Sequence, residues 1–155
     1  MAPPALVGAV TVVDFSTDTD VTDLLGSIAF AATNFRKRGG EITLRLETAA
    51  RSHCVFDPES RELRVGVVAG LSEGQLKERV KLWFQAEAKR LFTERLDLYA
   101  PRLDVHYRSM TLSSAGSRWG SCTVAGNIRL SWRLIHYPLA LIDYVVVHEL
   151  AHLRE

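Results

Sequence analysis

The sequence predicts an α+β fold in which a small antiparallel sheet packs with a long helix and a C-terminal helix. Residues 41–47 alternate between apolar and polar side chains, which is typical of a strand with one buried face. Residues 73–100 place apolar side chains at helical spacing, and residues 138–155 form a second, more apolar helical stretch. We therefore expect the long helix to pack on the sheet.

The composition is that of one globular domain. The chain has 155 residues, 47% of them hydrophobic and 24% charged, and this size can bury a substantial core. The formal net charge of +1 calls for neither a nucleic-acid nor a membrane partner. Residues 1–10 lack the positive charges of a signal peptide and are too short to span a membrane. Cys54 and Cys122 are too few for a disulfide framework, so we expect a cytoplasmic protein with reduced thiols.

The N-terminal half is predicted to contain one helix and several strands. A short strand is expected at residues 10–15. A helix is expected at residues 23–37, where apolar residues recur at helical spacing ahead of a pair of glycines. Further strands are expected at residues 41–47, 53–56 and 63–68, and the last two form a hairpin about a turn at residues 57–60.

The long helix is expected to begin near Glu73, because Ser72 and Gln75 have the spacing of a capping box. It should end before Pro101. The elements predicted after it are a strand at residues 104–112, a hairpin of residues 117–123 and 128–131 about a turn at 124–127, and a terminal helix with Pro138 in its first turn.

The terminal helix contains the motif H-E-x-x-H, formed by His148, Glu149 and His152. Residues four apart lie on the same face of a helix, so both histidines can direct a ring nitrogen at one point. Zn²⁺ binds imidazole nitrogens at about 2.0–2.1 Å. Glu149 projects about 100° around the helix, which suits a base beside the ion. This arrangement predicts a zinc-dependent hydrolase.

A structural interpretation of the same histidines is that they are core residues with satisfied hydrogen bonds. The surrounding helix argues against it, because its side chains are almost all apolar and buried ionisable groups need a partner or a metal. The run at residues 144–147 is aromatic and β-branched, which alone would suggest a strand. The length of the apolar segment and Pro138 favour a helix.

Residues outside the motif carry a resemblance to a known family. R-W-G-S-C at residues 118–122, N-I-R-L at 127–130 and D-Y-V-V-V-H-E-L-A-H at 143–152 together resemble the YgjP-like metallopeptidase domain, and SprT-like proteases are more distantly similar. Residues 71–155 match strongly, whereas residues 1–70 match only in the general order of elements. The resemblance implies a single domain with a zincin-like fold.

The resemblance also implies roles for the motif residues. His148 and His152 would be zinc ligands, and Glu149 would be the general base that takes a proton from the attacking water. The substrate would be a peptide or protein that pairs with an edge strand, for which residues 118–122 and 127–130 are the candidates.

Smaller roles can be assigned along these two segments. Arg118, Ser121 and Asn127 are candidate substrate-binding residues, although a structural salt bridge is an equally good interpretation of Arg118. Trp119 is expected in the core, and Gly120 is expected to permit a close approach to the backbone.

The family supplies its third metal ligand as a histidine six residues after the second motif histidine, whereas this sequence ends at Glu155, three residues after His152. We therefore expect a domain truncated before that ligand, with poor metal affinity. Glu155 lies on the helical face of His148 but too many turns away to replace it. The other histidines are expected at the surface or in hydrogen bonds: His53, His106 and His136.

Two other functions stay open. A metal-dependent nucleotide phosphohydrolase could use two histidines and a glutamate, but the sequence has no Gly-rich phosphate loop and no clustered carboxylates for Mg²⁺. A truncated zincin module could also be inactive and act only through contacts. Proteolysis linked to DNA is disfavoured because the composition provides no strongly basic face.

Overall fold

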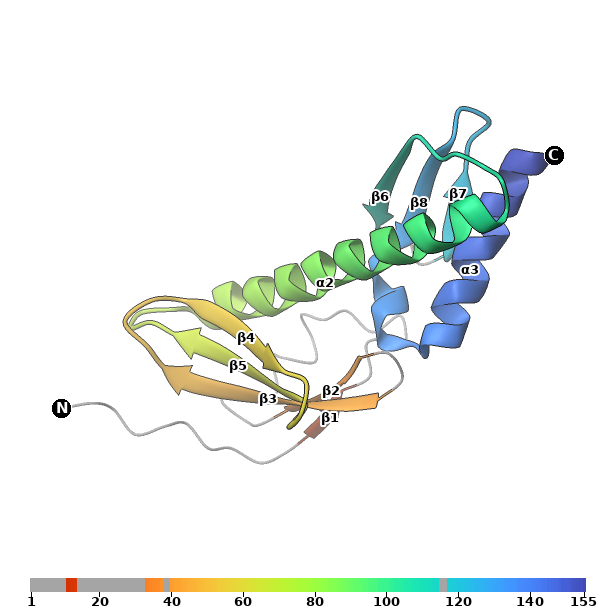
Figure 1. The fold of residues 1–155 in the computed structure, drawn as a ribbon. Coiled ribbons are helices and arrows are strands. Elements are labelled where there is room, and N and C mark those ends of the chain that lie inside the picture. Colours follow the sequence, from red (N-terminus) through yellow and green to blue (C-terminus); the bar gives the residue numbers. More distant parts are fainter. Residues whose placement is uncertain (1–10, 14–32, 38–39, 115–116) are drawn as a thin grey trace. The chain divides into compact units, whose positions relative to one another are not determined.

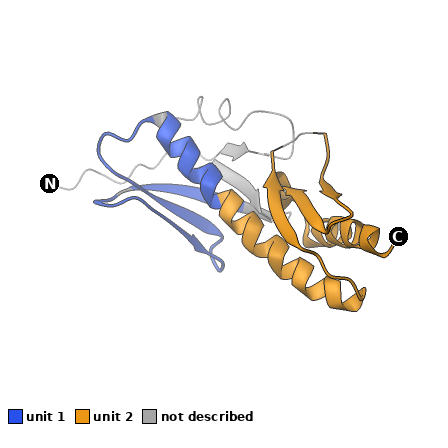
Figure 2. Cartoon of the chain, turned by 90° about the horizontal axis from the view of Figure 1, so that it is seen from above, with its two compact units in different colours: residues 1–83 blue, residues 84–155 orange. Residues whose placement is uncertain are grey.

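The computed structural model describes residues 11–13, 33–37, 40–114 and 117–155. The chain divides into two compact units, residues 1–83 and residues 84–155 (Figure 2). Helix α2 (Glu73–Arg102) begins in the first unit and ends in the second, and each unit has its own sheet (Figure 1). No helix within the described ranges is long and apolar enough to cross a membrane.

The first unit contains a five-stranded mixed sheet in the order β1–β2–β3–β5–β4. Its buried side chains alternate along β3 and β5, as the sequence predicts, and they include Leu44 and Leu63. On the next strand, Phe56 packs against Trp83 of α2, with 5.7 Å between the ring centroids. The strands are β1 (Thr11–Val13), β2 (Thr33–Lys37), β3 (Gly40–Thr48), β4 (His53–Asp57) and β5 (Glu62–Val67).

The expectation of an antiparallel sheet is wrong for two pairs in this unit. The predicted β4–β5 hairpin is confirmed, and so is the antiparallel β2–β3 pair. However, β3 and β5 run parallel, with Leu44 opposite Leu63, and β1 runs parallel to β2. The hairpin folds back so that β5, rather than β4, lies beside β3. A contact between strands that are not consecutive carries no local sequence signal.

The helix expected at residues 23–37 is wrong at its C-terminal end. Residues 33–37 form β2 and pair with β3, with Phe35 opposite Ile42. The backbone hydrogen bonds of this ladder outweigh a weak helical periodicity. The rest of the predicted helix lies outside the described residues, whereas Thr11–Val13 of the predicted first strand does form β1.

Helix α2 begins where the sequence predicts. The backbone N–H of Ser72 donates to Oε1 of Gln75 at 2.9 Å, and the N–H of Gln75 donates to Oγ of Ser72 at 3.2 Å. This reciprocal pair is a capping box, which satisfies two otherwise unpaired donors. The fully buried side chains of the helix recur at helical spacing, and they include Val80, Phe84, Ala88, Leu91, Phe92 and Leu96.

The end of α2 differs from the prediction, because Pro101 lies inside the last turn. The backbone N–H of Val105 donates to the carbonyl of Ala100 at 3.0 Å, and that of Asp104 donates to Pro101 at 3.2 Å. Asp104 has a φ of 54°, in the left-handed region. These features form a Schellman cap, which ends the helix past the proline. The cap uses the first residues of the strand predicted at 104–112, so β6 begins only at Ser109.

The second unit has a three-stranded sheet in the order β6–β8–β7. The predicted β7–β8 hairpin is confirmed, and Gly126 occupies its turn with a φ of 89°. The pair β6–β8 is parallel, with Met110 opposite Ile128, so the expected antiparallel arrangement is again wrong for one pair. Strand β7 forms one edge of this sheet. The strands are β6 (Ser109–Ser113), β7 (Gly120–Cys122) and β8 (Asn127–Ser131).

Three helical segments complete the second unit: the 3₁₀ turn η1 (Trp132–His136), helix α3 (Leu139–Ala151) and the 3₁₀ turn η2 (His152–Arg154). The predicted terminal helix is therefore present, with Pro138 as its N-cap. Its buried aliphatic side chains face inward, and they are Ile142, Val145, Val146 and Leu150.

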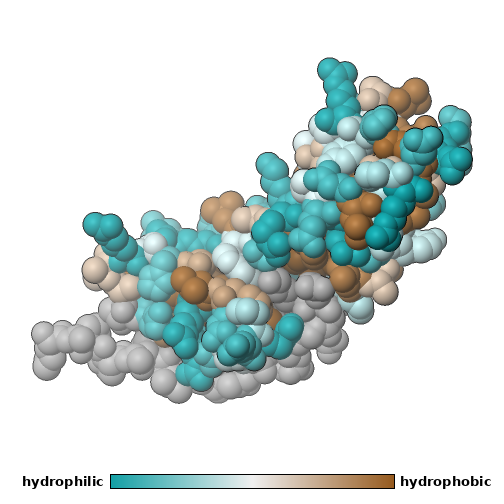
Figure 3. Space-filling view, in the orientation of Figure 1, coloured by the Kyte–Doolittle hydropathy of each residue, from teal (hydrophilic) through white to brown (hydrophobic). Residues whose placement is uncertain are grey.

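The surface of the described residues is mostly hydrophilic on the face shown in Figure 3. Brown apolar patches interrupt it only locally. The large apolar side chains that stay exposed are Val55, Leu82, Trp119, Val124 and Tyr144.

Candidate functional site

A cleft of about 490 Å³ lies between β7 and the C-terminal end of α3. It brings together the three motif residues and most of the segment R-W-G-S-C, which are separated by more than twenty residues in the sequence. Its lining residues are Arg118, Gly120, Ser121, Cys122, Thr123, Val124, His148, Glu149, His152 and Glu155.

The two motif histidines lie side by side in this cleft. His148 belongs to α3 and His152 begins η2, and their ring centroids are 5.0 Å apart with the rings nearly perpendicular. When two imidazoles bind the same Zn²⁺ ion, each with a Zn–N distance of about 2.1 Å, their ring centroids lie roughly 5 Å apart. The separation of the His148 and His152 rings is compatible with two ligands of one ion.

Glu149 is an ionisable group in an almost fully buried position, with 6% of its surface exposed. Its Oε2 lies 4.0 Å from Nε2 of His152, and no hydrogen-bond donor reaches the carboxylate within the described part of the chain. Buried carboxylates are normally hydrogen-bonded or paired with a charge. The acceptor capacity of Glu149 is thus left for a water molecule or ligand in the cleft.

Gly120 of β7 makes room for this carboxylate. A Cβ atom at position 120 would lie 3.0 Å from Cγ and from Oε1 of Glu149, and 3.0 Å from Cδ2 of Leu130. The expected close approach at Gly120 is present, and the approaching group is the Glu149 side chain. Only glycine at this position leaves the observed geometry undisturbed.

Cys122 lines the same cleft as a thiol. Burial raises its pKa, and the negative charge of Glu149 raises the pKa further. Its Sγ donates to the carbonyl of Thr123 at 3.4 Å. Metals bind the thiolate rather than the thiol, so this environment disfavours Cys122 as a ligand.

The described residues provide no evident third metal ligand beside His148 and His152. Among the described residues, no group of three or more His, Cys, Asp or Glu side chains is arranged to hold a metal ion. Glu155 places Oε2 3.5 Å from Nδ1 of His152, on the opposite ring nitrogen from the one nearest Glu149.

The remaining histidines lie elsewhere. His53 hydrogen-bonds to Glu47 in the first unit at 3.2 Å. His136 is buried and its ring packs against Phe84 at 4.9 Å. His106 lines a second cleft. None of these side chains lines the cleft that contains the motif.

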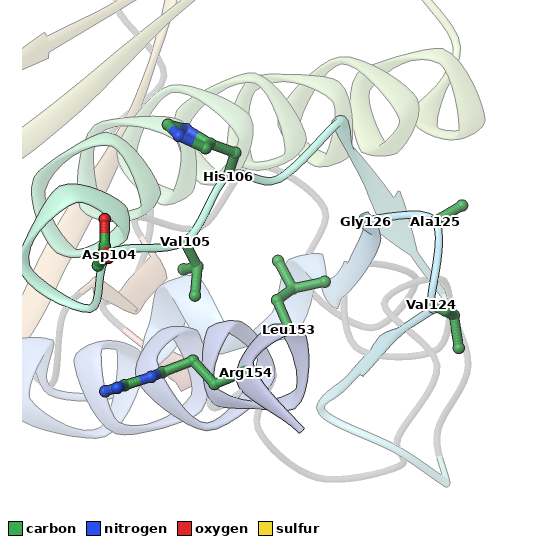
Figure 4. Close-up of a pocket in the computed structure, with 8 residues that line it drawn as sticks. All are labelled: Asp104, Val105, His106, Val124, Ala125, Gly126, Leu153 and Arg154. Carbon is green, nitrogen blue, oxygen red and sulfur yellow. The ribbon is translucent and has the colours of Figure 1, made fainter.

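The second cleft, of about 460 Å³, lies beside η2 (Figure 4). Val105 and Leu153 point into it, and Asp104, His106 and Arg154 also belong to its lining (Figure 4). It contains no group of three or more His, Cys, Asp or Glu side chains that could hold a metal ion, as is true of the described residues in general.

The residues predicted to bind substrate divide into two groups. Arg118 and Ser121 line the motif cleft. Asn127 does not; its Oδ1 accepts a hydrogen bond from Oγ of Ser109 at 2.9 Å, and its backbone N–H donates to Oγ1 of Thr123 at 3.1 Å. The geometry of Asn127 is therefore that of a turn residue, and a substrate role for it has no support from its position.

Trp119 does not belong to the core, contrary to expectation. Its surface is 40% exposed, and its ring lies edge-on to Tyr137 with 5.0 Å between centroids. Strand β7 lies at the edge of its sheet, so a side chain just before it has neighbours on only one side. Of the two strands proposed for substrate pairing, β8 is the central strand, which leaves β7.

Sequence reasoning missed two features beside the motif. Tyr144 is 67% exposed, and its ring stacks on that of His148 at 6.1 Å. Its position four residues before a candidate ligand was a usable signal. The second feature is a contact between Arg95 and Asp143, which no spacing rule could reveal because 48 residues separate the partners.

One comparison with known proteins identifies a family for this chain. The family model described as YgjP-like, metallopeptidase domain matches residues 29–155, which includes the strand segment and the whole motif. Searches of curated proteins and of solved structures gave no significant match. The family match extends well into the N-terminal half, beyond the part in which the resemblance is strong. The chain belongs to the YgjP-like metallopeptidase domain family.

Proposed function

We propose that this chain is a zinc-dependent peptidase domain in which His148 and His152 bind the ion and Glu149 is the general base. Family membership supports a metal-dependent peptidase. The observation that carries the finer assignment is the Glu149 carboxylate, which is nearly buried, lacks a hydrogen-bond donor among the described residues and adjoins two imidazoles 5.0 Å apart.

The residues have complementary roles in peptide hydrolysis. Bound zinc supplies Lewis-acid chemistry, which polarises the peptide carbonyl and lowers the pKa of a nearby water molecule. Glu149 accepts a proton from the attacking water and then transfers it to the nitrogen of the leaving amine. The carboxylate is thereby regenerated, and water is added across the broken C–N bond. His148 and His152 would each hold the ion through one ring nitrogen.

Strand β7 is the proposed docking element for the substrate backbone. It lies at the sheet edge, and all of its residues line the cleft. An extended peptide can add to such an edge through main-chain hydrogen bonds. Because Gly120 of this strand adjoins Glu149, a paired peptide would pass beside the carboxylate.

Arg118 precedes this strand and can bind a substrate carboxylate or stabilise a developing oxyanion. Its side chain is exposed and makes no ion pair with the described residues. This leaves the guanidinium available to a ligand.

The test is hydrolysis of a quenched fluorescent peptide library by the zinc-loaded chain. Glu149→Gln should lower the rate by roughly 10²–10⁴-fold, because it removes the proton acceptor and keeps the shape. Zinc affinity should stay close to that of the wild-type protein. Glu94→Gln is the matched control, since Glu94 is exposed on α2 and, among the described residues, pairs only with Arg90.

Two results would contradict the assignment. Hydrolysis that survives in Glu149→Gln would exclude the general-base role. Loss of zinc in that variant would instead make Glu149 a ligand.

A further inference from the structure

Arg95, Tyr99 and Asp143 form a hydrogen-bonded cluster between α2 and α3, called here the Arg95 cluster. Nε of Arg95 donates to Oδ1 of Asp143 at 2.6 Å, and Nη2 donates to Oδ2 at 2.8 Å. The hydroxyl of Tyr99 donates to the same Oδ2 at 3.0 Å. Only 16% of the Arg95 side chain and 19% of the Asp143 side chain are exposed.

The geometry of this cluster is directional. Two parallel N–H···O bonds between a planar guanidinium and a carboxylate fix the relative orientation of both groups. The hydrogen bonds to Asp143 also raise the pKa of Arg95. Nη2 of Arg95 also donates to the Tyr99 hydroxyl oxygen at 3.4 Å, so each of the three side chains is hydrogen-bonded to the other two.

Other charged contacts on α2 differ in kind. Arg90 pairs with Glu87 at 3.1 Å and with Glu94 at 3.4 Å, all within one helix, and 58% of its side chain is exposed. Such exposed ion pairs contribute little to stability, and these two lie within a single helix. The Arg95 cluster, in contrast, joins two helices in a partly buried environment.

Apart from Glu149, the buried side chains of α3 are aliphatic. Ile142, Val146 and Leu150 are completely buried, but their packing has no directional bonds. Aliphatic surfaces can repack after a small rotation of the helix, whereas two parallel hydrogen bonds between a guanidinium and a carboxylate form at only one rotation. Asp143 lies five residues before His148, a rise of roughly 7.5 Å along the helix. A rotation of α3 at Asp143 would therefore be passed directly to the motif.

We propose that Arg95, Tyr99 and Asp143 are positioning residues that fix the rotation of α3 and so place His148, Glu149 and His152 around the cleft. This inference rests on the proposed function of that cleft. It predicts that loosening the cluster changes the geometry of the motif before it unfolds the protein.

The first test uses the metal-free 155-residue chain. The NMR signals of the His148 and His152 rings and of the α3 backbone amides are compared among Asp143→Asn, Arg95→Lys and Tyr99→Phe. We expect clear shifts in the first two variants and smaller ones in Tyr99→Phe, which loses only one hydroxyl. Arg90→Lys is the matched control and should leave these signals unchanged.

The second test is zinc affinity, measured by competition with a chromophoric chelator. Asp143→Asn and Arg95→Lys should each weaken binding roughly tenfold, at the low end of what supporting residues of metal sites contribute. The double variant should be little worse than either single variant, because both remove the same contact. The control should match the wild-type protein.

The outcomes separate the two proposals. Ring signals and affinities in the cluster variants that equal those of Arg90→Lys would overturn the positioning role. Fully additive losses would do so as well. If wild-type chain binds no zinc, the proposed function fails, and the ring signals still decide the positioning role. If Asp143→Asn does not fold, Arg95→Lys and Tyr99→Phe provide the same comparison.

Discussion

The two sheets of this protein both bury aliphatic side chains but differ in what else lies against their inner faces. In the five-stranded sheet, the inward side chains of β3 and β5 are aliphatic, and Leu63 and Val65 are completely buried. In the three-stranded sheet, edge strand β7 presents Gly120 to the carboxylate of Glu149 instead. One inner face is therefore built only for packing, whereas the other borders a cleft with ionisable groups.

The charged groups show the same contrast. On the first sheet, Arg45 pairs with Glu62 at 2.6 Å, and the Arg45 side chain is 55% exposed. In the second unit, Glu149 is nearly buried and lacks a hydrogen-bond donor among the described residues. A surface pair can be solvated at little cost, whereas a nearly buried carboxylate that has no donor from the protein keeps part of its desolvation penalty. On the proposed function, the first sheet contributes stability and the second borders the groups that carry out the chemistry.

The largest expected effect comes from the first sheet. Leu63→Ala should lower the free energy of unfolding by about 2–5 kcal/mol, because it leaves a cavity at a completely buried position. Zinc affinity measured below the unfolding transition should be unchanged. Urea unfolding and chelator competition check the two quantities. A large loss of zinc affinity in the folded variant would break the proposed division of roles.

The second effect is on catalysis. Gly120→Ala introduces a methyl group 3.0 Å from Glu149, so the carboxylate must move. A misplacement of about 1 Å can cost roughly 100-fold in rate, so the shift of a few tenths of an ångström that is needed here should reduce peptide hydrolysis severalfold. Zinc affinity should be retained, since the histidines are untouched. Gly74→Ala on α2 is the control, because its nearest neighbour would be Oγ of Ser72 at 4.0 Å. Equal activities of the two variants would mean that Gly120 does not position Glu149.

The smallest effect is on thiol reactivity. Burial and the charge of Glu149 both raise the pKa of Cys122, so little thiolate is present at about pH 8. Glu149→Gln removes the charge, lowers the pKa and should accelerate alkylation by iodoacetamide severalfold at that pH. Cys54 serves as an internal control, because its pKa is raised mainly by burial in the first unit. An unchanged rate at Cys122 would show that the carboxylate does not act on the thiol.

Local signals in the sequence predicted most of the elements. The alternation of β3, the capping box at Ser72, the β7–β8 hairpin and the apolar α3 depend on neighbours within a few residues. The pairing of distant strands does not, and this is why parallel β3–β5 and β6–β8 were expected as antiparallel. The same reason explains β2, where strand pairing replaced the C-terminal end of the helix expected at residues 23–37.

For the candidate site, too, local spacing was informative and tertiary contacts could not be predicted. The spacing of His148, Glu149 and His152 predicted one common site, and all three line one cleft. Residues 118–122 and 127–130 were both candidates for the strand beside it, and four residues of 118–122 line the cleft. The exposure of Trp119 depends on the sheet edge, and the contact of Arg95 with Asp143 depends on how two helices pack. Such features are properties of the assembled fold rather than of any short segment.

The most direct test of the account is the zinc content and zinc affinity of the purified chain, measured beside His148→Ala. We predict measurable but weak zinc binding, because only two ligands are evident among the described residues, and we expect His148→Ala to lose it and Glu149→Gln to retain it. Zinc that binds equally to the wild-type chain and to His148→Ala, or no zinc in a folded wild-type chain, would contradict the assignment of the cleft between β7 and α3 as a metal centre.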